Sequence, residues 1–414
     1  MLKNNIVNRC SKGMEPLLFL VHRIPYPPNK GDKIRSFHFL KHLSEHFDVY
    51  LGAFIDDEDD LAYISTVKQY CTDVNLISIN PIWRTAISAK GLLTGSSLSV
   101  PYYDIDSMHH WVDSAIQQHQ IKKAFVFSSV MAQFVTRYKN MDIIADFVDI
   151  DSDKWRQYAE KKSWPISWVY SRESKCLLDY EMKVTKQSSQ VLFVSEKEAE
   201  LFKTFSHELS PKIDFVNNGV DIDFFTPSKS FSNPYKEHET AIVFTGAMDY
   251  WANVDAVVWF VEKVMPELRT KKKGMVFYIV GSKPSSQVRD LHAHDDVVVT
   301  GRVDDMRPYI QYADVIVAPL RIARGIQNKV LEAMAMGKPI VASPQAMEGI
   351  DADVSGVKVA DEPNEFVGAV LDMLLSESYL FGNREFVEAN FSWLESGNKL
   401  VSIINNIALP EEKS

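Results

Sequence analysis

The chain has 414 residues, of which 46% are hydrophobic and 24% are charged. These proportions are those of a soluble globular protein and exclude a disordered, collagenous or coiled-coil chain, while the length predicts at least two domains of about 150 residues or more. The 45 basic and 55 acidic residues leave a net charge of −10, which argues against nucleic acid as the main partner.

Short apolar runs alternate with longer amphipathic stretches along most of the chain, a pattern typical of parallel sheets covered by helices. The first series of expected strands comprises Leu17–Val21, Val49–Phe54, Val74–Ile79, Ala124–Phe127, Ile143–Phe147, Val191–Val194 and Asp214–Val216. The second comprises Ala241–Phe244, Val276–Val280, Val297–Thr300, Val315–Ala318, Ile340–Ala342 and Gly356–Val359. We therefore expect an α/β protein with two doubly wound domains and a ligand cleft at the carboxyl ends of the strands.

The domain boundary is expected at Asp221–Glu239, which holds Pro227, Pro234 and several serines and charges without a hydrophobic period. The predicted division is a domain over 1–220, a linker over 221–239, a domain over 240–383, and a helical tail over 384–414 that packs back on the first domain.

Targeting signals and cysteine motifs are not apparent in the sequence. The apolar run Leu17–Val21 is too short for a signal peptide or a membrane span, and the three cysteines have no Cys-x-x-Cys spacing. We therefore expect a cytoplasmic protein without a disulfide framework, and any membrane association to be peripheral.

The stretch from Asp314 to Ser343 is the most informative. A predicted strand ends near Pro319, a loop containing Gly325 follows, and a helix is expected to begin near Asn328. Free amides at the start of a helix bind phosphate. Arg321, Arg324 and Lys329 add positive charge, and Glu332 lies one turn into the helix, in a position to accept hydrogen bonds from a ribose. An ordinary βαβ unit with a solvated basic loop is the alternative.

The residues of this stretch, Ala323-Arg-Gly-x-x-Asn-Lys-x-Leu-Glu-Ala-Met-Ala-x-Gly-x-Pro339, resemble the donor-nucleotide signature of retaining GT-B glycosyltransferases of the large fourth sequence family (glycosyl transferases group 1). In that family two Glu residues eight positions apart flank the loop. Glu332 matches the second, whereas Arg324 stands at the first. The resemblance implies that Glu332 holds the ribose and suggests that Arg324 meets the diphosphate.

Further segments resemble the same family in the expected order. Val243–Asp255 resembles the glycine-rich loop that opens its second domain, with Gly246 in the loop and with Ala247 and Asn253 roughly where basic residues are common. Phosphate charge is then left to Arg324 and Lys329. Thr300–Asp305 resembles the loop that meets the nucleobase, which implies Arg302 and Val303, although a plain turn explains it as well.

Two segments of the first half resemble acceptor-side elements of the family. Pro25–Arg35 resembles its first glycine-rich loop, with Gly31 near the donor phosphates, although a proline-rich turn before a helix explains it about equally well. Asp149 and Asp151 follow a predicted buried strand. An acceptor-binding or acid/base role, helix capping and, least favoured, a metal site remain open for them.

Two other patterns have simple interpretations. The acidic run Asp56–Asp60 is interpreted as a solvated loop. Aromatic and leucine side chains are interleaved with basic residues, which fits either a surface that faces a lipid-linked acceptor or, as the favoured interpretation, core packing. These residues are Trp83, Leu92, Leu93, Trp164 and Trp168, with Arg84, Lys90, Lys161 and Lys162.

The resemblance runs from about residue 16 to Trp393 and implies a GT-B fold, two Rossmann-like domains facing across a cleft, with the acceptor on 1–220 and the nucleotide sugar on 240–383. It further implies transfer of a hexose with retention from a nucleotide diphosphate sugar to a glycan or lipid-linked acceptor, without metal or another cofactor. The subgroup that it is most similar to is the bacterial exopolysaccharide-associated sugar transferases of the PEP-CTERM/EpsH type, which implies peripheral contact with the cytoplasmic face of the inner membrane. The expected catalytic residues are Asp149, Asp151 and Arg324, and the expected donor-binding residues are Gly31, Gly246, Arg302, Val303, Gly325, Asn328, Lys329 and Glu332.

Two other functions stay open. A nucleotide-sugar epimerase shares the architecture, and an inert homologue that acts as a binding partner is suggested by Arg324, Ala247 and Asn253. A nicotinamide-dependent dehydrogenase is disfavoured because no Gly-x-Gly-x-x-Gly follows an expected strand.

Overall fold

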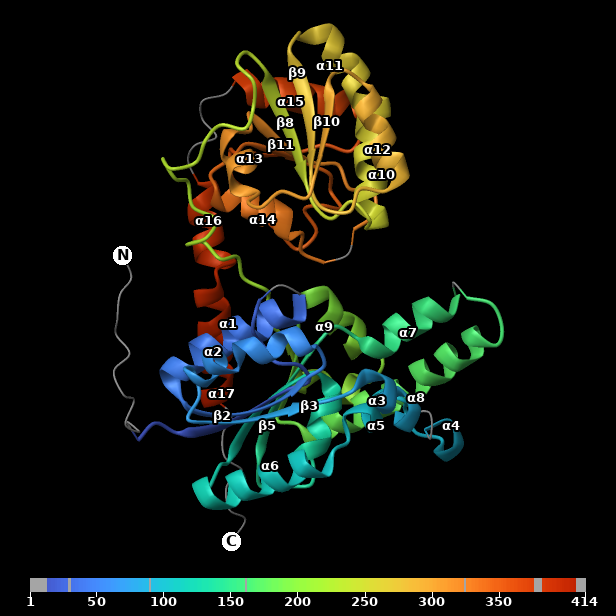
Figure 1. Ribbon diagram of the computed structural model, residues 1–414, viewed down its shortest axis with the longest axis vertical. Coiled ribbons are helices and arrows are strands. Elements are labelled where there is room, and N and C mark those ends of the chain that lie inside the picture. The colour runs from blue at the N-terminus through green and yellow to red at the C-terminus, as the bar shows by residue number, and fades with distance from the viewer. Residues whose placement is uncertain are drawn as a thin grey trace. The chain divides into compact units, whose positions relative to one another are not determined.

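The computed structural model describes residues 13–28, 31–88, 91–160, 162–323, 325–375 and 382–406. The chain forms two compact units, Met1–Asn218 with Ser396–Ser414, and Gly219–Glu395 (Figure 1). The segment expected to be a linker, 221–239, is part of the second unit, and the expected tail divides between the two units after Glu395.

The first unit is built on a seven-stranded parallel sheet in the order β3-β2-β1-β4-β5-β6-β7. The central strands are buried on both faces, which explains their nearly continuous apolar sequences. Its strands are β1 (Pro16–Val21), β2 (Asp48–Ile55), β3 (Asp73–Ser78), β4 (Lys123–Phe127), β5 (Asp142–Val148), β6 (Gln190–Phe193) and β7 (Ile213–Phe215). Its helices are α1 (Gly31–His46), α2 (Ile64–Lys68), α3 (Pro81–Ser88), α4 (Gly91–Thr94), α5 (Ser99–Tyr103), α6 (Asp106–His119), α7 (Asp151–Glu160), α8 (Ile166–Gln187) and α9 (Glu196–Lys203), together with most of α17 (Trp393–Asn406).

Lys33 and Arg35 of the first glycine-rich segment are buried within this unit. The Lys33 ammonium lies 2.5 Å from the Asp60 carboxylate and both side chains are buried, while the Arg23 guanidinium donates to Asp56 at 2.7 Å. The interpretation of the acidic run as a solvated loop is therefore wrong for Asp60, whereas Asp56 is partly exposed and residues 57–59 are exposed. Buried charges are tolerated because each has a partner.

The second unit is built on a six-stranded parallel sheet in the order β10-β9-β8-β11-β12-β13. Its strands are β8 (Thr240–Thr245), β9 (Met275–Val280), β10 (Val297–Gly301), β11 (Val315–Ala318), β12 (Ile340–Ala342) and β13 (Val357–Val359). Its helices are α10 (Trp251–Trp259), α11 (Met265–Lys271), α12 (Ser286–Asp290), α13 (Arg307–Tyr312), α14 (Asn328–Ala335), α15 (Pro363–Leu375) and α16 (Asn383–Asn390). Helices α10 and α12 lie on one side of the sheet, and α13 and α14 on the other (Figure 1).

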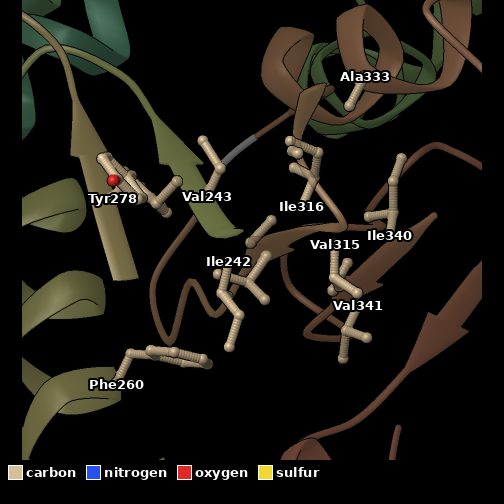
Figure 2. Packing of buried hydrophobic residues seen from close by; sticks show 14 of the residues in the cluster. Ile242, Val243, Phe260, Tyr278, Val315, Ile316, Ala333, Ile340 and Val341 are labelled. Atoms are coloured by element: carbon tan, nitrogen blue, oxygen red, sulfur yellow. The ribbon is translucent and has the colours of Figure 1, made fainter. Parts of the chain in front are cut away.

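The core of the second unit is formed by β-branched side chains of its central strands, with helices packed on both faces. Figure 2 shows Ile242 and Val243 of β8 beside Val315 and Ile316 of β11 and the β12 side chains, with Phe260 and Ala333 contributed by the helical layers. Each expected strand is present in the structure to within one residue at either end, so the alternation of apolar runs and amphipathic stretches predicted both sheets correctly.

None of the described helices is both long and apolar enough to cross a lipid bilayer.

Candidate functional site

The carboxyl ends of β8 and β11 form the switch point of the second sheet, because the strand order runs in opposite directions from this pair. Ligands of doubly wound sheets bind at such points. Gly246, directly after β8, has φ +155°, and a Cβ atom on Gly281, directly after β9, would lie 1.6 Å from the Gly246 carbonyl oxygen. The two turns therefore approach so closely that position 281 requires glycine.

A hydrogen-bonded chain links the glycine-rich loop to helix α14. The Lys329 ammonium donates to Asn253 Oδ1 at 2.5 Å, and Asn253 Nδ2 donates to the Ala247 carbonyl oxygen at 2.9 Å. The ammonium also lies 4.5 Å from the centroid of the Phe244 ring, and a Cβ atom on Gly246 would be 3.4 Å from it. Two of the segments singled out in the sequence, Val243–Asp255 and Asp314–Ser343, are thus joined at one point, with a cation beside the glycine backbone.

Lys329 and Glu332 lie one turn apart on α14 and are both partly buried. Desolvation lowers the pKa of Lys329 to about 8, a shift that the charge of Glu332 opposes. Desolvation likewise raises the pKa of Glu332 to about 7, against the influence of Lys329. Burial thus brings the pKa values of both groups close to neutral pH, and perturbed pKa values of this kind are common at functional sites.

The loop between β11 and α14 carries the other residues expected near the phosphates, and the structure describes it in part. Gly325 has φ +66°, a conformation that favours glycine, and its carbonyl oxygen accepts a hydrogen bond from Gln327 Nε2 at 2.9 Å. Asn328 is exposed at the first position of α14. Arg324 lies outside the described residues. Arg321, the third expected cation, donates from Nε to Asp255 at 2.9 Å and is therefore already paired.

The other expected donor residues lie apart from this cluster. Arg302 is exposed and Val303 packs partly against the core, both following β10, whose carboxyl end lies at the same edge of the sheet two strands from β8. Gly31 belongs to the first unit and begins α1. A Cβ atom there would meet no atom within 4 Å, so packing does not require glycine at this position.

Asp149 and Asp151 lie at the carboxyl end of β5, where α7 begins, in the first unit. The Lys154 ammonium lies 2.9 Å from an oxygen of Asp149 and 3.2 Å from one of Asp151. Burial favours the neutral amine, but the two carboxylates outweigh it and raise the pKa of Lys154 above its usual range. The lysine thus occupies the position between the carboxylates that a cation would take.

Sequence reasoning missed two carboxylates that hold this segment, of which Glu181 is buried and Glu198 is partly buried. Glu181 of α8 accepts hydrogen bonds from the Ser152 amide at 3.3 Å and from the Ser152 hydroxyl at 2.5 Å, and Glu198 of α9 accepts one from the Ile150 amide at 3.1 Å. Burial raises the pKa of Glu181 to about 8. The signal in the sequence was weak, because each glutamate lies in an amphipathic helix and only the tertiary structure turns it inward.

The described residues contain no group of three or more His, Cys, Asp or Glu side chains that could hold a metal ion. A groove of about 490 Å³ lies along α10 and the start of α12 in the second unit, with Trp251, Asp255 and Arg321 in its wall. Arg321, one of the expected cations, lines this groove, whereas Gly246, Lys329 and Glu332 do not.

Two doubly wound parallel α/β units define the GT-B class of fold, and solved structures agree with it. Sucrose-phosphate synthase from Thermosynechococcus elongatus is similar with a TM-score of 0.65 and 14% identity, over 95% of this chain and 99% of that one. A glycosyltransferase from Rickettsia africae gives 0.62 and 14% over 97% and 100%. HepE from Anabaena, solved in complex with UDP, gives 0.61 and 14% over 95% and 100%.

The sequence comparisons concern the family. Residues 239–376, most of the second unit, match the family described as glycosyl transferases group 1. An uncharacterized glycosyltransferase of Methanocaldococcus jannaschii is 22% identical over 213 residues, which are 47% of this chain and 53% of that protein. The match thus spans about half the length of this curated relative. Together the family match and the fold support glycosyltransferase activity.

Proposed function

We propose that the protein transfers a hexose, with retention at the anomeric carbon, from a nucleotide diphosphate sugar to a glycan or lipid-linked acceptor in exopolysaccharide or cell-surface polysaccharide biosynthesis. The single observation that carries the proposal is the Lys329–Asn253 hydrogen bond beside Gly246, within the region that matches the family. HepE, a structural neighbour, has been solved with UDP and with UDP-glucose.

In this proposal the second unit binds the donor. The Lys329 ammonium and the free amides at the start of α14 face the diphosphate, where negative charge develops as the sugar departs. Stabilising the leaving group in this way lowers the barrier because the interaction is stronger in the transition state than in the ground state. Glu332 accepts from the ribose hydroxyls, Arg302 and Val303 lie at the nucleobase, and Gly325, Asn328 and Arg324 complete the phosphate loop.

Asp149 and Asp151 are proposed to bind the acceptor hydroxyl. The hydrogen bonds from Ser152 to the buried Glu181 and from Ile150 to Glu198 fix the backbone that carries them, and the Lys154 ammonium is paired with both carboxylates. Gly31 is proposed to let the ligands approach the start of α1. We propose that the reaction needs no divalent metal, because the cations of the donor loop act on the diphosphate.

Thermal unfolding measured with a panel of nucleotide diphosphate sugars tests the proposal. A bound donor at about 100 times its dissociation constant stabilises the protein by about 2.7 kcal/mol. The stabilising donor, incubated alone and then with acceptor extracts, should be converted only in the second case. Conversion of the donor by itself into an isomeric sugar would instead identify an epimerase, and no stabilisation by any member of the panel would contradict donor binding.

A further inference from the structure

Large apolar side chains stand in solvent on one part of the first unit. Ile82 is 82% exposed, Trp83 70%, Trp164 80% and Trp168 56%. Core packing was the favoured interpretation of the tryptophans, and it is wrong for these three. We call the set of exposed apolar side chains on α3, on α4, in the turn before α8 and at the start of α8 the aromatic face: Ile82, Trp83, Leu92, Trp164, Ile166 and Trp168. Clustered exposure of this kind marks an interaction surface.

The segments that carry the aromatic face are tied together. Arg172 of α8 donates to the carbonyl oxygens of Gly91 at 2.6 Å and Ser96 at 3.0 Å, which fixes the α4 segment against α8. Trp168 lies one helical turn before Arg172 and so projects from the same side of α8. Figure 1 shows α3, α4 and the hairpin of α7 and α8 on one side of this unit.

The same segments are positively charged in an acidic protein. Residues 80–103 contain Arg84 and Lys90 and no acidic residue, and residues 161–172 contain Lys161, Lys162 and Arg172 and no acidic residue, whereas the whole chain has a net charge of −10. The Arg84 side chain donates to the carbonyl oxygens of Pro101 and Tyr102, just as Arg172 donates to carbonyl oxygens. Two acidic residues adjoin these segments: Glu160 is paired with Arg156, and Glu173 is buried and accepts hydrogen bonds from Ser97 and Ser99. Basic residues therefore outnumber acidic ones around the aromatic face.

We propose that the aromatic face docks on the headgroup region of a bilayer that contains anionic lipid. Tryptophan prefers this depth because its ring is apolar and its N–H group is polar. Basic residues close to the surface are attracted by anionic headgroups. A second copy of the chain is a poor occupant, because two such faces would bring like charges together.

The inference rests on the proposed function in one respect, namely that a lipid-linked acceptor gives the docking a purpose. Helix α7 has 10 residues between the Asp149–Asp151 segment and the turn that carries Trp164, which is about 15 Å at 1.5 Å per residue. The proposed acceptor carboxylates and the turn with Trp164 therefore lie near opposite ends of one short helix, in the same unit.

Sedimentation of the full chain with lipid vesicles tests the docking without any donor. We expect binding to vesicles of phosphatidylethanolamine with phosphatidylglycerol, weak binding to pure phosphatidylcholine, and a clear loss when NaCl is raised from about 0.1 to 1 M, which shortens the screening length from about 10 to 3 Å. Trp83→Ser and Trp164→Ser should each weaken binding about tenfold, from the transfer of one large apolar side chain. Lys162→Glu should weaken it several-fold.

Leu375→Ser is the matched control, since Leu375 is 86% exposed but lies in the second unit. It should bind vesicles as the original chain does, and all four variants should keep the same melting temperature and nucleotide affinity. Equal binding to both kinds of vesicle, unchanged binding of both tryptophan variants, or a dimer in solution that Trp83→Ser converts to a monomer would each overturn the inference. Failure of the proposed function would appear separately, as the absence of nucleotide binding.

Discussion

Replacing Glu332 with Gln tests the assignment of the ribose contact. The substitution preserves size and one acceptor oxygen but removes the negative charge. A hydrogen bond to a charged group contributes about 1.5–3 kcal/mol, so the affinity for a nucleoside diphosphate should fall by about 10- to 150-fold. Isothermal titration with the nucleoside diphosphate of the donor that the panel identifies measures this loss.

The loss should depend on pH in a defined direction. With a pKa of about 7, Glu332 is about three quarters ionised at pH 7.5 and about one tenth ionised at pH 6. The advantage of the original chain over the Gln variant should therefore shrink several-fold between pH 7.5 and pH 6. The choice of pH 7.5 keeps most of Lys329 protonated, because its pKa is about 8.

The stability of the same variant is the control. Because the pKa of Glu332 in the folded protein lies above its usual value of 4.5, ionisation disfavours the folded state, and this cost grows as pH rises from about 4.5 to about 7. Gln removes it, so the variant should melt no lower than the original chain at pH 7.5. An unchanged affinity, or an equal loss at both pH values, would refute a ribose contact through an ionised Glu332.

Three further predictions follow from the site. Chelation of divalent metal should leave turnover unchanged in a product assay, and loss restored by magnesium or manganese would instead point to Asp149 and Asp151 as ligands. Arg324→Glu should weaken the binding free energy of the nucleoside diphosphate by about 3–4 kcal/mol and leave binding of the nucleoside unchanged. Parallel titrations with the two ligands measure this, and equal losses for both would mean a disrupted pocket. Glu181→Ala should lower the free energy of unfolding by about 1–3 kcal/mol, since the buried Ser152 donors lose their acceptor. Glu181→Gln, in contrast, should unfold later than the original chain at neutral and alkaline pH, because a carboxyl whose pKa is raised from 4.5 to about 8 in the folded protein destabilises the fold increasingly as pH rises from about 4.5 to about 8. Equal denaturation curves at pH 9 would contradict this.

The sheets were predictable because local periodicity determines them. A nearly continuous apolar run such as that of β1 must be buried on both faces of a sheet. Such a run can therefore be identified as a strand from the sequence alone, without knowing which strands lie beside it. The position of Lys329 was also partly predictable, because the predicted strand before it and the flanking glycines Gly325 and Gly337 limit where α14 can begin and end. Its hydrogen bond to Asn253, 76 positions away in the sequence, is a tertiary contact that no local pattern encodes.

The surface of the first unit was harder to predict for a physical reason. A run of apolar residues has the same composition in a core and on an interaction surface, so Trp83 and Trp164 were assigned to a core that does not contain them. The reverse error concerns Asp60, which belongs to an acidic run yet is buried against Lys33. Burial depends on which partner the fold brings near, and both errors come from residues whose partners are distant in the sequence.

The departures from the family signature bear on whether the chain is active. An inert homologue would be expected to lose phosphate-binding charge without replacement, and Ala247 and Asn253 taken alone fit that view. In the structure, however, Asn253 and the Ala247 carbonyl oxygen form a chain of hydrogen bonds that ends on the Lys329 ammonium, next to Gly246. The neutral side chain thus positions a cation from another helix beside the glycine loop. Partial desolvation of the Lys329 ammonium, which lowers its pKa to about 8, destabilises the folded protein, and a bound diphosphate would offset this loss. This favours a phosphate-binding site over the site of an inert homologue.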